Sequence, residues 1–179
     1  MLILLFLSII LLYYKNIDKI WNILKERGLL ENTIVIISSD HGEEFNDNKL
    51  NYWGHNSNFT DAQIKIPLVV HWPGRAQQVF NHLTTAYDIS ATLMKEELMC
   101  TNDFSDYTVG QSLFDTSSSR NWFLAGDYNN LAIVEDERIV VIDRFGMLKF
   151  KDKAFKKTDR EEKNANMFLA LELIARYRK

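Results

Sequence analysis

The segment from Thr33 to Phe45, TIVIISSDHGEEF, constrains the fold of this chain more than any other part of it. Its β-branched apolar run favours a strand that is buried on both faces, and the run leads directly into Asp40-His41-Gly42. Open α/β sheets bind their ligands at the carboxyl ends of their strands. Asp40 offers a hard carboxylate oxygen and His41 a borderline nitrogen, a pair that suits a divalent cation. The alternative is a surface turn that only happens to carry polar residues.

Composition limits the other classes of protein that the chain can belong to. Its 179 residues fit one domain, and a hydrophobic content of 46% is enough to form a core. The net charge of −3 gives no electrostatic case for binding nucleic acid, which requires a basic surface. A single cysteine, Cys100, excludes an internal disulfide framework.

The first fourteen residues, MLILLFLSIILLYY, carry no charge. They are fewer than the roughly 20 apolar residues that span a bilayer, and they lack the positive start and small-residue cleavage site of a signal peptide. Three interpretations stay open for residues 1–14: a membrane-associated anchor, a buried helix, or a segment foreign to the ancestral protein. Residues 15–179 are then expected to form the folded portion.

Periodicity and turn residues predict the order of the remaining elements. Helices are expected over Asn16–Leu30, which ends in a glycine stop, over Thr85–Met99 and over Asn166–Tyr177. Strands are expected over Thr33–Ser38 and Ile66–Trp72, with a long loop, Asn46–Thr60, between them. Four further short strands are predicted at Trp122–Gly126, Leu131–Glu135, Arg138–Asp143 and Met147–Lys151. The expected fold class is α/β, with a parallel sheet core, a small appended antiparallel sheet and a C-terminal helix.

Three blocks of sequence carry a resemblance to a known family. They are SSDHGEEFNDNK, NYWGHNSNFTD and the strand-like KIPLVVHWPG, followed by AYDISATLM at Ala86–Met94. Together they resemble the alkaline phosphatase and sulfatase superfamily, and more specifically the YejM-like inner-membrane proteins, over roughly residues 15 to 150. The resemblance implies a partial sulfatase-like domain, its carboxy-terminal portion, in this chain.

The resemblance also implies roles for individual residues. Asp40 and His41 match a metal-binding pair, and His55 matches a histidine that contacts the substrate phosphate or a second metal. The alternative for His55 is a solvated loop histidine without such a role. Glu43 and Glu44 are expected to accept hydrogen bonds that orient His41, the alternative being that at least one of them only faces water. Lys65 precedes the second strand, where a cation could hold an anionic group, although a charged residue is equally ordinary there. Trp53 is expected to pack in the core or at its rim.

The function implied by the resemblance is metal-dependent hydrolysis or transfer at phosphate or sulfate esters, with lipid headgroups among the substrates. Superfamily members place the nucleophile and a first metal-binding carboxylate upstream of the Asp-His-Gly, and the first 39 residues offer no counterpart. We therefore assign no catalytic residue within this chain and expect it to be inactive alone. The alternative is a non-catalytic module that binds anionic lipid and regulates lipopolysaccharide or outer-membrane assembly. Both functions imply the periplasmic side of the inner membrane, and zinc, manganese, magnesium and calcium are not distinguished.

Overall fold

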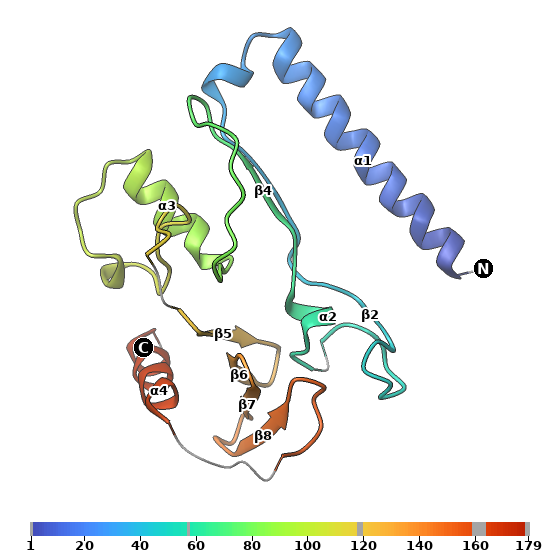
Figure 1. Ribbon diagram of the computed structural model, residues 1–179, viewed down its shortest axis with the longest axis vertical. Coiled ribbons are helices and arrows are strands. Elements are labelled where there is room, and N and C mark those ends of the chain that lie inside the picture. The colour runs from blue at the N-terminus through green and yellow to red at the C-terminus, as the bar shows by residue number, and fades with distance from the viewer. Residues whose placement is uncertain (1, 57, 118–119, 159–163, 178–179) are drawn as a thin grey trace. The chain divides into compact units, whose positions relative to one another are not determined.

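The computed structural model describes residues 2–56, 58–117, 120–158 and 164–177, with side chains from Tyr14 onward. The chain divides into two compact units. The first comprises Met1–Ser39 and Pro67–Gln78, and the second comprises Asp40–Ile66 and Val79–Lys179. Their elements are drawn in Figure 1, and each unit is described by itself below.

The first unit contains helix α1 (Leu2–Glu26), the short 3-10 helix η1 (Leu30–Asn32) and strands β1 (Val35–Ser38) and β4 (Leu68–His71). The predicted apolar segment and the predicted helix after it form one continuous helix (Figure 1). Helix α1 ends as the sequence indicates, because Gly28 adopts φ +64° and the Leu29 N–H bonds to the Leu24 carbonyl at 2.8 Å. The predicted burial of residues 1–14 lies outside the described side chains. Among the described residues, none of the helices combines the length and apolar character needed to cross a membrane.

The two predicted core strands pair with each other in antiparallel orientation, whereas a parallel sheet was expected. Strands β1 and β4 are antiparallel, with Val35 opposite His71 and Ser38 opposite Leu68. The Ser38 hydroxyl also donates to the Pro67 carbonyl at 2.9 Å, where β4 begins. The expected parallel pairing is therefore wrong for these strands. A continuous apolar run indicates that both faces are covered, but it contains no information about the direction of the neighbouring strand.

The second unit has short elements within and on either side of the segment predicted as a long loop, Asn46–Thr60. Strands β2 (Glu44–Phe45) and β3 (Trp53–Gly54) form a short antiparallel hairpin, and helix α2 (Asp61–Ile64) follows. Helix α3 (Tyr87–Glu96) confirms the helix predicted over Thr85–Met99 within two or three residues at each end, and the 3-10 helix η2 (Phe104–Asp106) comes after it. Strands of two residues give no alternation long enough to be recognised in a sequence.

A four-stranded antiparallel sheet confirms the predicted run of short strands. Its strands are β5 (Trp122–Gly126), β6 (Leu131–Glu135), β7 (Arg138–Ile142) and β8 (Leu148–Asp152), hydrogen-bonded in that order. On one face, Ile133 and Val140 pack with Met167 and Ala170 of the C-terminal helix α4 (Ala165–Tyr177). The appended sheet and the C-terminal helix were both expected from the sequence.

The other face of this sheet is covered by the segment that leads from β3 to α2. Phe59, only 4% exposed, packs against Ala132, Val134, Ile139 and Val141, and Ile64 of α2 joins the same cluster. The strand alternation explains the division, since Ala132 and Val134 share one face while Ile133 lies on the other. The sheet therefore supports the region that carries the predicted site residues.

A buried ion pair connects α3 to the loop before β5. Asp88, which is completely buried, accepts hydrogen bonds from both terminal nitrogens of Arg120, at 2.7 and 2.8 Å. The same carboxylate accepts the backbone N–H groups of Thr85 and Gln111 at 2.7 and 2.8 Å. Four donors around one buried carboxylate compensate for its loss of hydration.

Candidate metal centre

The turn after Asp40-His41 lies against α2 at a distance that only glycine allows. The Gly42 N–H donates to the Gln63 carbonyl at 2.8 Å. A Cβ atom at position 42 would lie 2.2 Å from the carbonyl oxygen of Ala62, which is backbone and cannot rotate away. Gly42 therefore fixes the path of the chain, and with it the positions of His41 and Glu43.

Glu44 is a buried anchor of the loop that carries the predicted site. It is 0% exposed, and its carboxylate accepts hydrogen bonds from the side-chain amides of Asn48, Asn58 and Gln63 at 3.0, 2.6 and 2.8 Å. Burial alone would raise the pKa of this carboxyl, but the three amide hydrogen bonds outweigh it and lower the pKa below the ordinary value. Glu44 therefore neither contacts water nor orients His41, but fastens the β2–β3 loop to α2.

The imidazole of His41 has a defined orientation. Its Nδ1 lies 2.8 Å from the carbonyl oxygen of Gly42, an acceptor, so Nδ1 carries the proton and Nε2 carries the lone pair. The side chain is 39% exposed, and Nε2 lies 3.7 Å from a carboxylate oxygen of Asp40. A backbone hydrogen bond of this kind is how metal-binding histidines are held in one tautomer.

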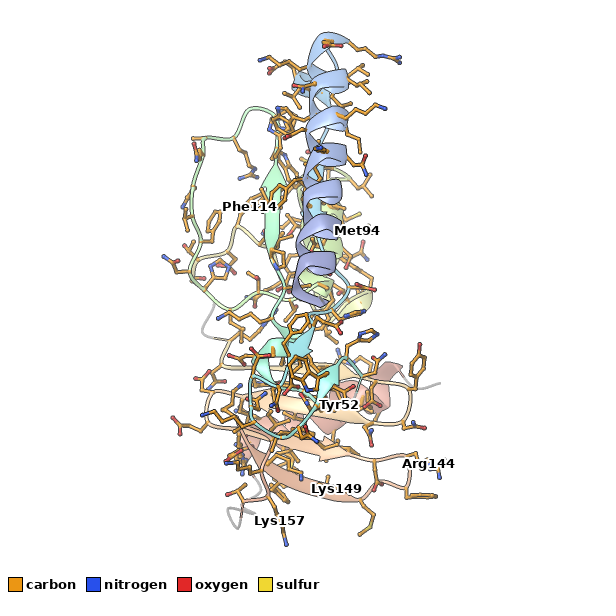
Figure 2. All side chains as sticks on the ribbon, turned by 90° about the vertical axis from the view of Figure 1, so that its right-hand side faces the viewer. Tyr52, Met94, Phe114, Arg144, Lys149 and Lys157 are labelled. Carbon is orange, nitrogen blue, oxygen red and sulfur yellow. The ribbon has the colours of Figure 1, made fainter. Side chains whose placement is uncertain are left out.

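Glu43 and His55 meet across the hairpin. Nδ1 of His55 lies 2.9 Å from a carboxylate oxygen of Glu43, and the two side chains are 40% and 31% exposed. The His55 ring stacks on the His41 ring with centroids 4.0 Å apart and an angle of 23°. Tyr52, labelled in Figure 2, donates its hydroxyl to the His55 carbonyl and steadies this side of the loop. Glu43 was expected to orient His41, and the structure places it against His55 instead.

These three side chains form a compact group of potential ligands. One ligand atom from each of His41, Glu43 and His55 lies within 4.8 Å of the others. Two imidazoles and one carboxylate suit zinc or manganese better than magnesium or calcium, which require more oxygen ligands. The exposure of each side chain leaves room for further ligands from solvent or substrate.

The other predicted site residues, Asp40 and Lys65, are not part of this cluster. The Asp40 side chain is 86% exposed, and its carboxylate lies 3.7 Å from Nε2 of His41. Asp40 is not among the three clustered residues of the described chain. Lys65 is exposed directly after α2, where its backbone N–H bonds to the Asp61 carbonyl at 2.9 Å. The support that Asn58 and Gln63 give to the loop was not predicted. Their shared partner, Glu44, is 14 and 19 residues away in the chain, and no local sequence pattern indicates such a contact.

Comparison with known proteins shows which family the chain is similar to. Residues 11–96 match the sulfatase family. The inner membrane protein YejM of Salmonella typhimurium is 30% identical over 131 residues, which cover 73% of this chain and 22% of the relative. A protein of Haemophilus influenzae is 32% identical over 156 residues, covering 87% of this chain and 26% of the relative. The chain thus spans about a quarter of the length of these curated relatives.

More distant proteins agree with this result. An arylsulfatase of Hemicentrotus pulcherrimus is 35% identical over 83 residues, which cover 42% of this chain and 15% of the relative. A solved structure, titled for the metabolism of multiple glycosaminoglycans by Bacteroides thetaiotaomicron, aligns with a TM-score of 0.63 at 21% identity, covering 90% of this chain and 41% of its own. The fold is therefore sulfatase-like. Residues 11–96 match the sulfatase family, and the chain is similar to the YejM-like inner-membrane proteins.

Proposed function

We propose that this chain contributes one side of a metal-dependent site for sulfate or phosphate esters. The observation that carries the proposal is the clustering of His41, Glu43 and His55, whose ligand atoms lie within 4.8 Å of one another beside the turn of the family motif. A divalent cation at such a site would polarise an ester oxygen as a Lewis acid. His41, with its lone pair on Nε2, and Glu43 would hold the cation, and Asp40 is a further candidate ligand beside the same nitrogen.

His55 has two roles open to it in this site. With Nδ1 donating to Glu43, the Nε2 of a neutral His55 ring offers its lone pair to a cation, whereas in the doubly protonated ring Nε2–H would donate to an anionic ester oxygen. Glu43 then acts as the carboxylate that fixes the tautomer of His55. Lys65 remains a proposed weak anion contact. Because no nucleophile or first metal carboxylate was identified before Asp40, we expect weak metal binding and no ester turnover by this chain alone.

Metal titration tests the site directly. We expect Zn²⁺ or Mn²⁺ binding by isothermal titration calorimetry to weaken in His41→Ala and in Glu43→Gln by at least about 10- to 100-fold, the range found when the hydrogen-bond partners of metal ligands are removed. His82→Ala, a histidine outside the cluster, is the matched control and should leave the Kd unchanged. Equal affinity in all three variants would contradict the proposed site.

Ester turnover tests the second half of the proposal. The chain with bound metal should not hydrolyse 4-nitrophenyl sulfate or 4-nitrophenyl phosphate above the rate of a metal-free sample. Turnover that disappears in Asp40→Ala would show that the chain holds a complete catalytic site, and the expected inactivity would then be wrong.

A second candidate function, lipid binding without turnover, is favoured by the relation to an inner membrane protein. In this case the chain acts at the periplasmic side of the inner membrane, and the exposed site binds the anionic headgroup of a lipid as part of lipopolysaccharide or outer-membrane assembly. Saturable binding to vesicles of anionic phospholipid that persists in Asp40→Ala supports this function. Absence of binding to these vesicles removes it.

A further inference from the structure

Two turns of the four-stranded sheet lie at the same end of it. The β5–β6 turn spans residues 127–130 and the β7–β8 turn spans residues 143–147. Leu131, which follows the first turn, is paired with Ile142, which precedes the second, so both turns leave the sheet at the same end. Adjacent strands are about 4.8 Å apart, and the two turns are therefore roughly 10 Å apart. We call residues 127–130 and 143–147 the paired turns.

The paired turns expose three large apolar side chains. Tyr128 is 91% exposed, Phe145 is 77% exposed and Met147 is 63% exposed. Trp53 of the β2–β3 hairpin is 60% exposed as well, although it was expected to pack in the core or at its rim, but its ring packs edge-to-face on Phe45 at 6.3 Å. Single exposed apolar residues are ordinary on a protein surface, whereas three on two neighbouring turns are typical of an interaction site.

The two carboxylates of the paired turns are held against the backbone. Asp127 accepts backbone N–H groups from two asparagines of its own turn, each at 2.7 Å. Asp143 accepts two backbone N–H groups of its turn, each at 3.0 Å, and its side chain is only 15% exposed. Lys149 lies 3.2 Å from the same carboxylate. The acidic groups are therefore used to shape the turns, while the apolar side chains extend into solvent.

Positive charge flanks the apolar side chains. Arg144 is exposed, and its guanidinium lies 4.8 Å from the centre of the Phe145 ring. Lys149, whose side chain is 56% exposed, begins a run of five lysines that ends at Lys157 and contains one acid, Asp152. Arg144, Lys149 and Lys157 are labelled in Figure 2. Because the whole chain carries a net charge of −3, this concentration of cations is a local feature.

We propose that the paired turns dock on an anionic lipid bilayer. Tyr128, Phe145 and Met147 enter the layer just below the headgroups, and Arg144 and Lys149 stay at the depth of the lipid phosphates. Aromatic side chains favour this layer, and cations beside it are attracted by the negative surface. A bilayer has anionic charge at its surface and apolar chains directly beneath, which matches exposed cations around projecting apolar tips better than an acidic protein surface does.

This inference goes beyond the proposed function and does not depend on it. The paired turns contain none of the three clustered residues of the candidate metal centre, and contact through the turns requires no divalent cation. The lipid binding considered above as a second function would occur at the metal centre instead. The two are therefore distinguished by the place at which the chain touches the lipid.

A fluorescent label shows which end of the sheet enters the bilayer. The single cysteine is removed by Cys100→Ser, and the full chain is labelled with the environment-sensitive dye NBD at Phe145→Cys. The matched control carries the dye at Glu137→Cys, an exposed position in the β6–β7 turn at the opposite end of the sheet, about 15 Å away. On vesicles of equal parts phosphatidylcholine and phosphatidylglycerol in EDTA, emission at position 145 should increase and shift to shorter wavelength. Emission at position 137 should stay as in water.

Substitutions in the unlabelled chain measure the contribution of each group by vesicle co-sedimentation. Phe145→Ser should weaken binding to these vesicles about tenfold, the loss expected when one aromatic side chain is no longer transferred out of water. Arg144→Gln should weaken it about fivefold, an effect that disappears on pure phosphatidylcholine. Val79→Ser is the matched control, because Val79 is 79% exposed in the second unit and lies outside the paired turns. Far-UV circular dichroism shows whether each variant is folded.

The possible failures are separable. If the chain binds the vesicles while the dye at position 145 still reports water, the contact lies elsewhere on the chain and the inference is overturned, whereas the proposed function stands. Equal changes at positions 145 and 137, or equal losses in Phe145→Ser and Val79→Ser, would show non-specific adsorption and would also overturn it. If the chain does not bind the vesicles at all, the inference and the second candidate function fail together, and the metal titration still decides the first.

Discussion

Replacement of Glu44 by glutamine tests how the candidate site is held in place. The carboxylate accepts three side-chain amide hydrogen bonds, from Asn48 to one oxygen and from Asn58 and Gln63 to the other. Glutamine has a single carbonyl oxygen, and its NH₂ group would face at least one of these donors. The change is close to isosteric, so it alters charge and hydrogen bonding and leaves the packing volume nearly unchanged.

The magnitude follows from the number of donors affected. A buried donor without an acceptor costs about 1–3 kcal/mol, and each remaining bond loses the extra strength of an ionised acceptor. With one or two donors affected, we expect Glu44→Gln to lower the free energy of unfolding by about 2–4 kcal/mol at pH 7. Urea unfolding followed by far-UV circular dichroism measures this difference, and Glu137→Gln, an exposed residue of the β6–β7 turn, is the matched control.

The pH dependence of the stability difference provides the decisive test of this explanation. The pKa of Glu44 is lowered in the folded chain from the ordinary value of 4.5, so the folded state favours the ionised carboxyl. The contribution of Glu44 to the free energy of unfolding is fully present above pH 4.5 and is lost as the pH falls through the lower pKa of the folded state. The difference between wild type and Glu44→Gln should therefore shrink towards pH 3. A difference below about 0.5 kcal/mol at pH 7, the range of ordinary surface substitutions, or one that stays constant with pH, would refute the reasoning.

Two further predictions concern buried contacts. Gly42→Ala should lower the free energy of unfolding by about 1–3 kcal/mol and weaken Zn²⁺ binding, because its Cβ would lie 2.2 Å from the Ala62 carbonyl oxygen and displace His41; urea unfolding and metal calorimetry measure the two effects. Asp88→Asn should lower the free energy of unfolding by about 3–5 kcal/mol, because the buried charge of Arg120 would lose its carboxylate partner. Thermal unfolding measures this loss.

Each of these two predictions has its own control variant. Gly126→Ala places a methyl group 3.3 Å from a movable leucine side chain and should change neither stability nor metal affinity greatly. Unchanged Zn²⁺ affinity in a folded Gly42→Ala protein would show that the turn does not position His41. For Asp88, the double variant Asp88→Asn with Arg120→Met should recover part of the lost stability, and no recovery would contradict the ion-pair explanation.

Much of the fold could be predicted because its signals are local. The glycine that ends α1, the apolar run of β1 and the alternation in β5 to β8 each lie within a few neighbouring residues. The Asp-His-Gly turn was recognised for the same reason, and the comparisons confirm the family to which it pointed. The hairpin and α2 were missed because elements of two to four residues are shorter than the periods by which helices and strands are recognised.

The candidate site was predicted less completely, since its arrangement depends on distant contacts. The sequence placed an acid and an imidazole at the end of a strand, but Asp40 is mostly exposed while Glu43 and His55 join His41. Glu43 and Glu44 are adjacent and chemically identical, yet Glu43 joins the cluster while Glu44 is buried against Asn58 and Gln63.

What the sequence by itself determined is therefore the set of elements and the family. What the tertiary structure decided is which groups meet: the antiparallel pairing of β1 with β4, the anchoring of Glu44, and the packing of Phe59 on the four-stranded sheet beneath the site loop. The physical reason is that hydrophobic periodicity and turn residues indicate only which side chains of a segment are buried and where its backbone turns. The partner of a buried side chain is selected by packing between segments far apart in the chain, and this leaves no mark in the local pattern of either one.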